Sequence, residues 1–523
     1  MQEQVAICVG HAGTLTPVRH QERVATVASC AMAATSHPRA TDAALDILRA
    51  GGNACDAAVA AAAVLCVCEP MSTGIGGDAF ALVWRDGGLT GLNASGRAPR
   101  SADPGALERI PLHGPMSVTV PGTVSGWVAL LERHGRIGLD QCLAPAIDAA
   151  ERGFVATPII SQAWVELAPA LAGDPELAAC FTPAPRVGDI VTNPALGATL
   201  RRVADLGGDG LYRGPVADAI CAASWIELED LAAHEAEWVE PLRLAYRDVE
   251  VVELPPNGWG AAALQALGIA AGFDLASAPD ADRIHLQAET IKLAFSDAHR
   301  YIADEPLPAG YLDPGYLEGR RTLIDLRRAR DPSPGTLPTG GTVYLCVVDE
   351  DRMACSFIQS LYHGFGSRVG APGTGIALQN RAAGFTLAPG HPNCLAPGKR
   401  PFHTIIPGML LRDGALLGPF GVMGAHMQAQ GHLQVVSAMI DRGCDPQQAL
   451  NAPRFRCDPS ADGWGLALEP DLWHLADNLA RRGHRVGRDP DRSGFGGGQI
   501  IQCAGDQLIG GSEPRKDGYA AGI

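Results

Sequence analysis

No stretch of the sequence is apolar for long enough to cross a membrane, and the N-terminus lacks the pattern of a secretion signal. The longest apolar run extends from Ala57 to Cys68, well short of the roughly 20 residues that a membrane-spanning helix needs. Residues 1–10 include the acidic Glu3 and have no basic start followed by an apolar segment. We therefore expect a cytoplasmic protein with no membrane partner.

Positive charge is also scarce. The chain has 41 Lys and Arg against 57 Asp and Glu, a formal net charge of −16. This balance excludes a general affinity for nucleic acids or anionic surfaces. Hydrophobic residues make up 46% and charged residues 19% of the sequence, which is a globular composition and excludes wholesale disorder. A chain of 523 residues can bury a large core without disulfides or a metal.

Several motifs for metals, nucleotides and nucleophiles are missing. The Cys66-Val-Cys68 pair has no second pair at zinc spacing, and the fifteen histidines are scattered without a His-Glu-x-x-His sequence. The glycines of 74–77 precede a predicted strand and lack the Gly-Lys-Ser/Thr ending of a phosphate loop, so they indicate a tight turn. No Gly-x-Ser-x-Gly elbow is present, which argues against an α/β-hydrolase. We expect neither a metal nor a cofactor.

The N-terminal part of the chain shows clear helix and strand signals. Residues 1 to about 24 have no period and are expected to form a loose leader. Thr41 is the expected N-cap of a helix that ends at Gly51-Gly52. Residues 56–68 are nearly all Ala and Val, which predicts a helix buried between layers. The glycine-rich turn then leads into a strand at 79–84.

Farther along, the pattern is mostly helical from about 125 to 305. Residues 306–341 are rich in Pro and Gly and are expected to form an exposed connection. A strand at 342–349, a turn at 350–352 and a returning strand at 353–360 follow, and the first strand is apolar on both faces, as in a sheet covered on both sides. The remaining expected elements are a hairpin turning at Asp413-Gly414 and helices at roughly 425–441 and 470–481.

Thr342 stands at an unusual place in this pattern. A threonine that opens a strand is usually there as a β-former. Here, however, Gly340-Gly341 end a long Pro- and Gly-rich segment directly before it. If the chain were cut between Gly341 and Thr342, the new α-amino group would lie beside the Thr342 hydroxyl and could act as the base for that nucleophile. The spacing alone leaves both interpretations open.

Residues 342–349 resemble the start of the small subunit in the γ-glutamyltransferase family. The members of this family are N-terminal-nucleophile hydrolases that cut themselves before this threonine. The resemblance extends from about residue 25 to the C-terminus, and we identify the chain as a member. Further segments resemble the family in the same order, namely His37 to Ala43, Gly51 to Ala54, Asp56 to Ala60, Glu69-Pro70, Gly74 to Gly77, Val120 to Thr123, Pro397 to Pro401 and Asp517 to Gly522.

The resemblance implies an α+β fold, specifically a four-layer αββα sandwich. It implies a zymogen that cleaves itself at Gly341–Thr342 and then works through an acyl-enzyme on Thr342. A large-subunit segment, 1–341, and a small-subunit segment, 342–523, would form one intertwined domain. The partners implied are therefore a small-molecule substrate and the chain's own two fragments as a heterodimer.

Further catalytic residues follow from the same resemblance. Ser360 falls where the family has a second hydroxyl residue that positions and polarises the nucleophile, although a strand-end serine without a catalytic role is the alternative. Gly424 and Ala425 match the paired backbone amides that bind the oxyanion. The family has Gly-Gly there, and Ala425 keeps the amide N–H. The helix expected to begin at about 425 would present aligned N–H groups at the same point.

The γ-glutamyl pocket of the family is poorly matched. Where the family has an arginine for the substrate α-carboxylate, this chain has Ser95, with Arg97 two positions later. Tyr362 and Gly384 stand where an Asn and an Asp would receive the α-amino group, and His403-Thr404 replace a serine pair. Without an acid, a bound glutamyl ammonium would be buried unpaired, which is costly.

A better match is the branch of the family that includes oxamate amidohydrolase, which residues 356–367, 421–424 and 430–432 resemble. We therefore expect a small acidic amide such as oxamate as substrate, its carboxylate held by Arg97 and His403 unless those two are merely structural. The alternatives are γ-glutamyl hydrolase or transferase activity on glutathione-like compounds, and acylase activity on a β-lactam side chain. An unprocessed, non-enzymatic homologue is the remaining possibility.

Overall fold

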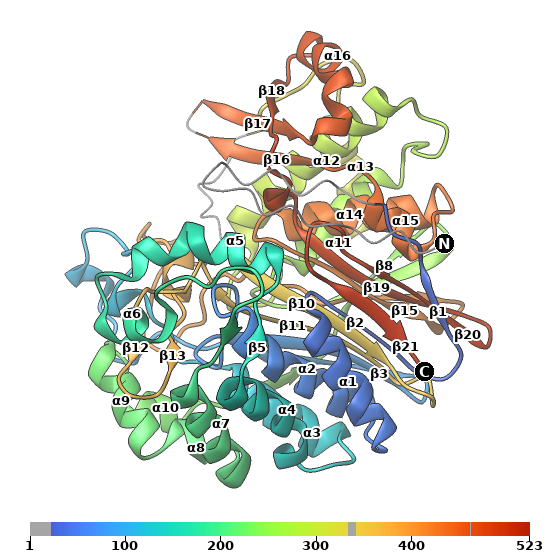
Figure 1. Ribbon diagram of the computed structural model, residues 1–523. Helices are drawn as coiled ribbons and strands as arrows, with labels where there is room; N and C mark the ends of the chain where they lie inside the picture. Colours follow the sequence, from blue (N-terminus) through green and yellow to red (C-terminus); the bar gives the residue numbers. More distant parts are fainter. Residues whose placement is uncertain (1–21, 333–340, 461) are drawn as a thin grey trace, which may run out of the picture.

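Two seven-stranded sheets face each other at the centre of the molecule, and helices cover both outer faces (Figure 1). The computed structural model describes residues 22–332, 341–460 and 462–523. The layers run from α1–α4 through the two sheets to α11 and α14. The expected four-layer αββα sandwich of the α+β class is confirmed. None of the described helices is both long and apolar enough to cross a membrane.

The first sheet is antiparallel throughout and carries the predicted nucleophile. Its outer face is covered by α1 (Pro38–Arg49) and α2 (Ala54–Cys68). Its strands, in spatial order, are β21 (Tyr519–Gly522), β2 (Met32–Thr35), β10 (Gly341–Val348), β11 (Ala354–Tyr362), β3 (Asp78–Arg85), β4 (Gly88–Ala94) and β7 (Glu237–Val239).

The second sheet is also antiparallel and supplies the loop that leads into α14. It is covered by α11 (Gly260–Ala270) and α14 (Met427–Ile440). Its strands, in spatial order, are β1 (Thr26–Ala28), β20 (Gln507–Ser512), β19 (Gly497–Ala504), β15 (Ala415–Met423), β14 (Gly408–Arg412), β9 (Val249–Glu253) and β8 (Leu242–Tyr246).

Close packing between the two sheets explains why residue 421 is a glycine. Tyr344 on β10 is fully buried, and its hydroxyl lies 2.8 Å from that of Ser356 on β11. A Cβ atom on Gly421 of the facing β15 would come within 2.5 Å of the Tyr344 ring. Because protein interiors leave no room for such an overlap, only glycine fits there. The sheets are thereby held in a fixed register around the start of β10.

Both N-terminal helices are present, with corrected starts. α1 is capped by His37, whose side chain accepts from the Arg39 amide, with Pro38 as the first helical residue. Thr41, expected as the N-cap, lies inside the helix and donates its hydroxyl to the Tyr519 carbonyl. The all-buried α2 is capped by a box between Asn53 and an aspartate three residues later. Its three cysteines are buried and unpaired, as expected of small core residues.

The stretch from 125 to 305 is not as uniformly helical as expected. It includes β7, β8, β9 and the short pair β5 (Phe154–Val155) and β6 (Ile190–Val191). These strands are only two to five residues long, so their apolar pattern is too brief to distinguish from a helix turn. Its helices are α3 (Thr123–His134), α4 (Leu139–Arg152), α5 (Pro158–Leu167), α6 (Pro175–Phe181), α7 (Pro194–Leu206), α8 (Asp209–Tyr212), α9 (Pro215–Ala223), α10 (Leu228–Ala232), α11 and α12 (Asp280–Tyr301).

The expected leader and connection are only partly described. Residues 1–21 and 333–340 lie outside the described residues. Arg23, within the expected leader, donates to the carbonyls of Gly518 and Lys516, so the chain is already fixed there. The connection contains α13 (Pro314–Arg321), and Leu317 is buried against α11 and α12. The described part of the connection, 306–332, is therefore more ordered than its Pro and Gly content predicts.

A smaller unit projects from the sandwich beyond α12, at the top of Figure 1. It consists of α16 (Ala476–Arg481) and a three-stranded sheet of β16 (Phe455–Ser460), β17 (Gly463–Leu468) and β18 (Arg485–Arg488). The helix expected at 470–481 is a 3₁₀ turn over Pro470–Leu475 followed by α16. The hairpin predicted at Asp413-Gly414 joins β14 to β15, with positive φ at both residues.

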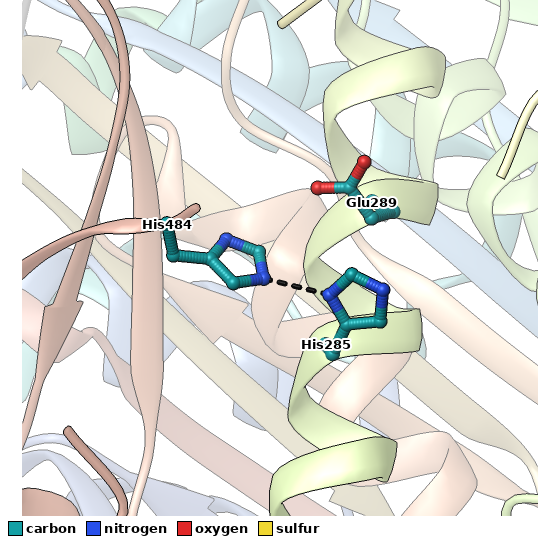
Figure 2. Close-up of side chains that lie close together, drawn as sticks. All are labelled: His285, Glu289 and His484. Atoms are coloured by element: carbon teal, nitrogen blue, oxygen red, sulfur yellow. Dashed lines mark hydrogen bonds between the residues drawn. The ribbon is translucent and has the colours of Figure 1, made fainter. Parts of the chain in front are cut away.

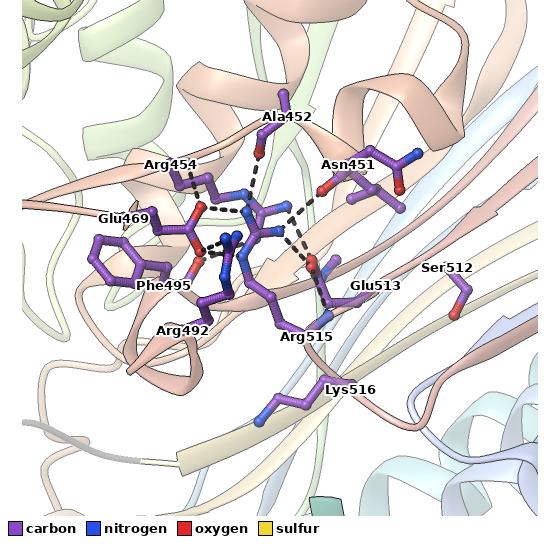
Figure 3. A network of polar contacts seen from close by, with 12 residues as sticks. Asn451, Ala452, Arg454, Glu469, Arg492, Phe495, Ser512, Glu513, Arg515 and Lys516 are labelled. Carbon is purple, nitrogen blue, oxygen red and sulfur yellow. Dashed lines mark hydrogen bonds and ion pairs between the residues drawn. The ribbon is translucent and has the colours of Figure 1, made fainter. Parts of the chain in front are cut away.

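A buried ion-pair network anchors the C-terminal segment to this unit (Figure 3). The Arg515 guanidinium contacts the carboxylates of Glu469 and Glu513, each at 2.6 Å. Arg454 lies 3.0 Å from the second Glu513 oxygen. The two arginines hold the pKa of Glu513 below its ordinary value despite complete burial. Such a network is costly to break, because removing one partner leaves a buried charge unpaired.

Candidate active site

β10 and β11 pair irregularly where the predicted nucleophile lies. Val343 pairs with Gln359, whereas Gly341 pairs with Tyr362, so β11 has one residue more than β10 in between. A bulge of this kind interrupts the ladder and redirects a side chain, and bulges are common beside active sites. Thr342 is therefore presented by a locally distorted strand end, next to the bond at which the chain is expected to be cut.

The Thr342 hydroxyl is held by two side chains from different layers. Its Oγ1 donates to Ser360 Oγ at 3.3 Å and accepts from Gln428 Nε2 at 3.3 Å. Gln428 lies in the first turn of α14, and its Oε1 accepts from the Ile406 amide at 3.1 Å, which fixes the orientation of the amide group. Thr342 is only 4% exposed. Hydrogen bonds to Ser360 and Gln428 therefore fix the position of the Thr342 hydroxyl oxygen.

Ser360 stands in a ring of donors. Its Oγ accepts from the Tyr362 amide at 2.8 Å and from Arg381 Nη2 at 3.1 Å, in addition to Thr342. The Tyr362 amide and the Arg381 guanidinium both favour negative charge on the serine oxygen. The structure thus brings Thr342 and Ser360 within hydrogen-bond distance, and the positioning role of Ser360 remains a prediction.

Arg381 is a buried cation at the centre of the site. Its Nη1 donates to Thr404 Oγ1 at 3.1 Å, and its guanidinium carbon lies 4.1 Å from the centroid of the Tyr362 ring. Burial lowers its pKa to about 10, so it stays charged at neutral pH. In the described part of the chain, no carboxylate forms a direct ion pair with Arg381, and its Nε has no hydrogen-bond partner. Asp78 acts on it only at longer range.

Asp78 and His403 form a buried pair behind this cation. The Asp78 carboxylate accepts from the amides of Gly96 and Gly122, at 2.9 and 3.2 Å, and from His403 Nε2 at 3.1 Å. Burial raises the pKa of Asp78 to about 6, with the charge of Arg381 opposing the rise. Burial also holds the pKa of His403 well below its ordinary value, so the imidazole is neutral and donates its Nε2 proton.

The candidate oxyanion amides lie where β15 turns into α14. Gly424 has φ +122° and Ala425 has φ +51°. Neither amide donates to another residue within the described ranges, so both remain available to a ligand. The left-handed backbone costs a non-glycine residue roughly 1–2 kcal/mol. Strain of this kind persists at functional sites where the surroundings impose it.

The other predicted substrate-binding residues are engaged elsewhere. Arg97 pairs with Glu237 at 2.9 Å and with Asp304 at 3.1 Å, on a half-exposed side chain. Ser95 is fully buried, and its hydroxyl donates to Asn93 Oδ1 at 2.7 Å. These contacts do not connect either residue to Thr342. A role of Arg97 in binding the substrate remains a prediction.

Comparisons with known proteins show the family to which the chain belongs. The family described as Gamma-glutamyltranspeptidase matches residues 40–523. The chain belongs to the gamma-glutamyltranspeptidase family. An oxamate amidohydrolase proenzyme from Klebsiella pneumoniae is 36% identical, with 95% of this chain and 99% of that protein covered. A glutathione hydrolase-like proenzyme from Bacillus subtilis is 33% identical, with 94% of this chain and 98% of that protein covered.

A solved structure is also similar over nearly the whole chain. The cephalosporin acylase from Bacillus halodurans is 43% identical, with a TM-score of 0.93 and with 98% of this chain and 99% of that chain covered. The resemblance stated from the sequence is confirmed. This member of the gamma-glutamyltranspeptidase family is therefore an amidohydrolase or acyltransferase of the N-terminal-nucleophile type.

Three residues of this gamma-glutamyltranspeptidase site were missed by sequence reasoning. Gln428 had a signal, because it lies just after the predicted oxyanion amides in the first turn of a predicted helix. Asp78 had a weaker one, at the end of the glycine-rich turn. Arg381 had none, because an arginine in a loop is usually exposed. Its burial depends on the path that the chain takes between β11 and β14.

Proposed function

We propose that this protein cleaves itself at Gly341–Thr342 and then hydrolyses a small acidic amide such as oxamate through an acyl-enzyme on Thr342. The observation that carries the proposal is that Ser360 links the predicted nucleophile, Thr342, to the buried cation, Arg381. Ser360 Oγ lies 3.3 Å from the Thr342 hydroxyl and 3.1 Å from the Arg381 guanidinium. A buried arginine two hydrogen bonds from the nucleophile favours a substrate whose carboxylate lies next to the scissile amide.

The processing step needs only the chain's own groups. The Thr342 hydroxyl attacks the Gly341 carbonyl carbon, forming a C–O bond as the C–N bond breaks. The hydroxyl proton passes to the nitrogen, which becomes the Thr342 amine. Water then hydrolyses the ester, giving the Gly341 carboxylate and restoring the hydroxyl. The bulge at this point of the ladder supports the proposal, since strained backbone is common at sites of this kind.

Turnover uses the same hydroxyl on an external amide. The freed amino group takes the hydroxyl proton as Oγ1 attacks the substrate carbonyl, and the amides of Gly424 and Ala425 stabilise the oxyanion. Ammonia leaves with that proton, and an acyl ester remains on Thr342. Water then releases the acid. The two fragments stay together as a heterodimer, because β10 and β11 from one segment lie between β2 and β3 from the other.

Arg381 is a better anchor for the carboxylate than Arg97 in this proposal. In oxamate the carboxylate is bonded directly to the scissile carbonyl carbon, so its anchor must lie within a few ångströms of the nucleophile. Arg381 meets this condition through Ser360, whereas Arg97 already has two carboxylate partners. The same cation would repel the ammonium of a γ-glutamyl head group. Glutathione-like compounds are therefore expected to be poor substrates.

A second candidate is acylase activity on a carboxylate-bearing side chain of a β-lactam. It is favoured by the 43% identity to the cephalosporin acylase from Bacillus halodurans. The nucleophile, oxyanion amides and Arg381 would keep their roles, and only the space for the leaving amine would differ. For either activity we propose a cytoplasmic location, where the unpaired cysteines of the described chain would stay reduced.

Parallel assays on the processed enzyme test the proposal. Ammonia release from oxamate is compared with nitroaniline release from a γ-glutamyl anilide and with release of the amine from a glutaryl cephalosporin. We expect the highest kcat/KM for oxamate. A clearly higher value for the γ-glutamyl compound would overturn the proposed substrate class, and a higher value for the cephalosporin would select the second candidate.

A further inference from the structure

Three potential metal ligands meet at the junction of α12 with the small C-terminal unit (Figure 2). His285 and Glu289 lie one helical turn apart on α12, which places them on one face. His484 comes from the residue directly before β18. All three are buried, and one ligand atom of each lies within 4.8 Å of the other two. No local motif indicates this cluster, because the two histidines are 199 positions apart in the sequence.

The hydrogen bonds around His285 leave one of its nitrogens free to bind a metal. Its Nε2 lies 2.8 Å from the Asp325 carbonyl oxygen. Because a carbonyl can only accept, Nε2 carries the proton and Nδ1 carries the lone pair. Metal-binding histidines commonly donate their second nitrogen to a carbonyl in this way. The lone pair of Nδ1 is aimed at His484 Nε2, 2.8 Å away.

His484 is not fully satisfied by this arrangement. Its Nε2 must supply the proton in the bond to His285, which leaves its Nδ1 as a buried acceptor. Within the described residues that Nδ1 atom has no partner. Buried polar atoms without partners are uncommon, and each calls for an explanation. Because Nδ1 has no partner, His484 can change its tautomer without breaking a further hydrogen bond.

Glu289 is oriented by its own set of contacts. One carboxylate oxygen accepts from Lys292 Nζ at 2.8 Å, and the other accepts from the Arg330 amide at 2.8 Å. Lys292 is itself tied to the Arg330 carbonyl at 3.0 Å. These contacts fix the carboxylate beside the histidine pair. They also balance its charge in the absence of a metal, so the pocket can fold empty.

We propose that His285 Nδ1, His484 Nε2 and Glu289 bind one zinc ion, with water in the fourth position. Two imidazoles and a carboxylate are a donor set that Zn²⁺ prefers, at bond lengths of about 2.0–2.2 Å. Tetrahedral ligands at those bond lengths lie roughly 3.3 Å apart, so the histidine nitrogens would separate slightly. The Nε2 proton of His484 moves to Nδ1, and no net proton is released.

The site would link the two segments of the chain. His285 and Glu289 precede residue 341, and His484 follows it. A metal bound only by the folded form stabilises that form. Zinc would therefore fasten the small C-terminal unit to α12 after processing, with no part in the reaction at Thr342. The proposal is independent of the substrate.

The test measures zinc bound to the full-length protein after treatment with a chelator and dialysis. His484→Gln keeps a side-chain donor near His285 but provides a poor zinc ligand. His474→Gln, at an exposed histidine of the same unit, is the matched control. We expect one tightly bound zinc per chain in the wild type and the control, and binding weaker by roughly a hundredfold or more in His484→Gln. Equal binding by all three proteins would overturn the proposal.

A second measurement does not depend on how the variant folds. X-ray absorption at the zinc edge of the loaded wild-type protein reports the ligands directly. Two imidazoles with oxygen ligands completing a four-coordinate shell would support the site. A shell with no imidazole or only one would contradict it, because the ion would then be bound elsewhere on the protein.

Discussion

Replacing Arg381 by methionine separates the two candidate anchors for the substrate carboxylate. Methionine has a similar length and fills the buried space without charge or hydrogen bonds. In the wild type, two Nη atoms of Arg381 donate to Ser360 and Thr404, both at 3.1 Å. A carboxylate bound at this guanidinium would add charge-assisted contacts worth roughly 1.5–3 kcal/mol each. Loss of two such contacts corresponds to about 3–6 kcal/mol, or roughly 10²–10⁴ in kcat/KM.

The effect on stability should be smaller than the effect on activity. Burial lowers the pKa of Arg381 to about 10, so keeping the charge inside the protein already has a cost that methionine removes. The loss of the donors to Ser360 and Thr404 acts in the opposite direction. We therefore expect Arg381→Met to remain folded, and denaturing gels show how much of it has processed.

The assay compares oxamate with its uncharged ethyl ester in processed enzyme, with active sites counted by acylation. For wild type we expect a strong preference for the anion. Arg381→Met should abolish that preference, whereas Arg97→Met should retain it, since Arg97 pairs with Glu237 and Asp304. If Arg97→Met abolishes the preference and Arg381→Met keeps it, the argument for Arg381 is refuted, and the anchor first expected from the sequence is the correct one.

Three further predictions concern the surroundings of the site. Ser360→Ala should slow both processing and turnover by about 10²-fold, measured by gel densitometry and ammonia release, and unchanged rates would make Ser360 a purely structural residue. Arg515→Met should lower the free energy of unfolding by about 3–5 kcal/mol, because the fully buried Glu469 and Glu513 lose the guanidinium that they share and only Arg454 still pairs closely with Glu513. Urea unfolding measures this, and a change below 1 kcal/mol would contradict it. Burial raises the pKa of Asp78 from 3.8 to about 6. Between these pH values the folded form binds a proton that the unfolded form has lost. The contribution of Asp78 to stability therefore falls as the pH rises from about 4 to above 6. Relative to Asp78→Asn, wild type should therefore be less stable at pH 7 than at pH 4 by about 3 kcal/mol, and a difference that does not change with pH would show that Asp78 titrates normally.

Part of the site follows from local pattern. The hairpin predicted from strands at 342–349 and 353–360 around a three-residue turn is present, with Val343 opposite Gln359, and the register shifts at Thr342 itself. A side-chain hydrogen bond still joins Thr342 to Ser360. The helix predicted directly after Gly424 and Ala425 is present as α14, whereas the assignment of these two residues as oxyanion amides came from the family resemblance and remains a prediction. These features depend on contacts that are close in the sequence or fixed by a hairpin.

The rest depends on tertiary structure that a local pattern does not contain. Arg381 and Arg97 are the same residue type, and the sequence around them does not distinguish their environments. Arg381 is buried against the Tyr362 ring, whereas Arg97 pairs with acidic side chains at the surface. The short strands β7 to β9 take their conformation from the sheets that they join at the edges. The cluster of His285 with His484 exists only because the residue before β18 lies against α12. In each case the partner is more than a hundred residues away or lies across a loop.

The central claim is that Thr342 becomes the nucleophile when the chain is cut before it. The most direct measurement is N-terminal sequencing of the smaller fragment of the purified protein. We predict that this fragment begins Thr-Val-Tyr-Leu, and that Thr342→Ala gives a single uncut chain of 54.5 kDa. A wild-type protein that stays as one band, or a fragment that begins at any other residue, would contradict the account.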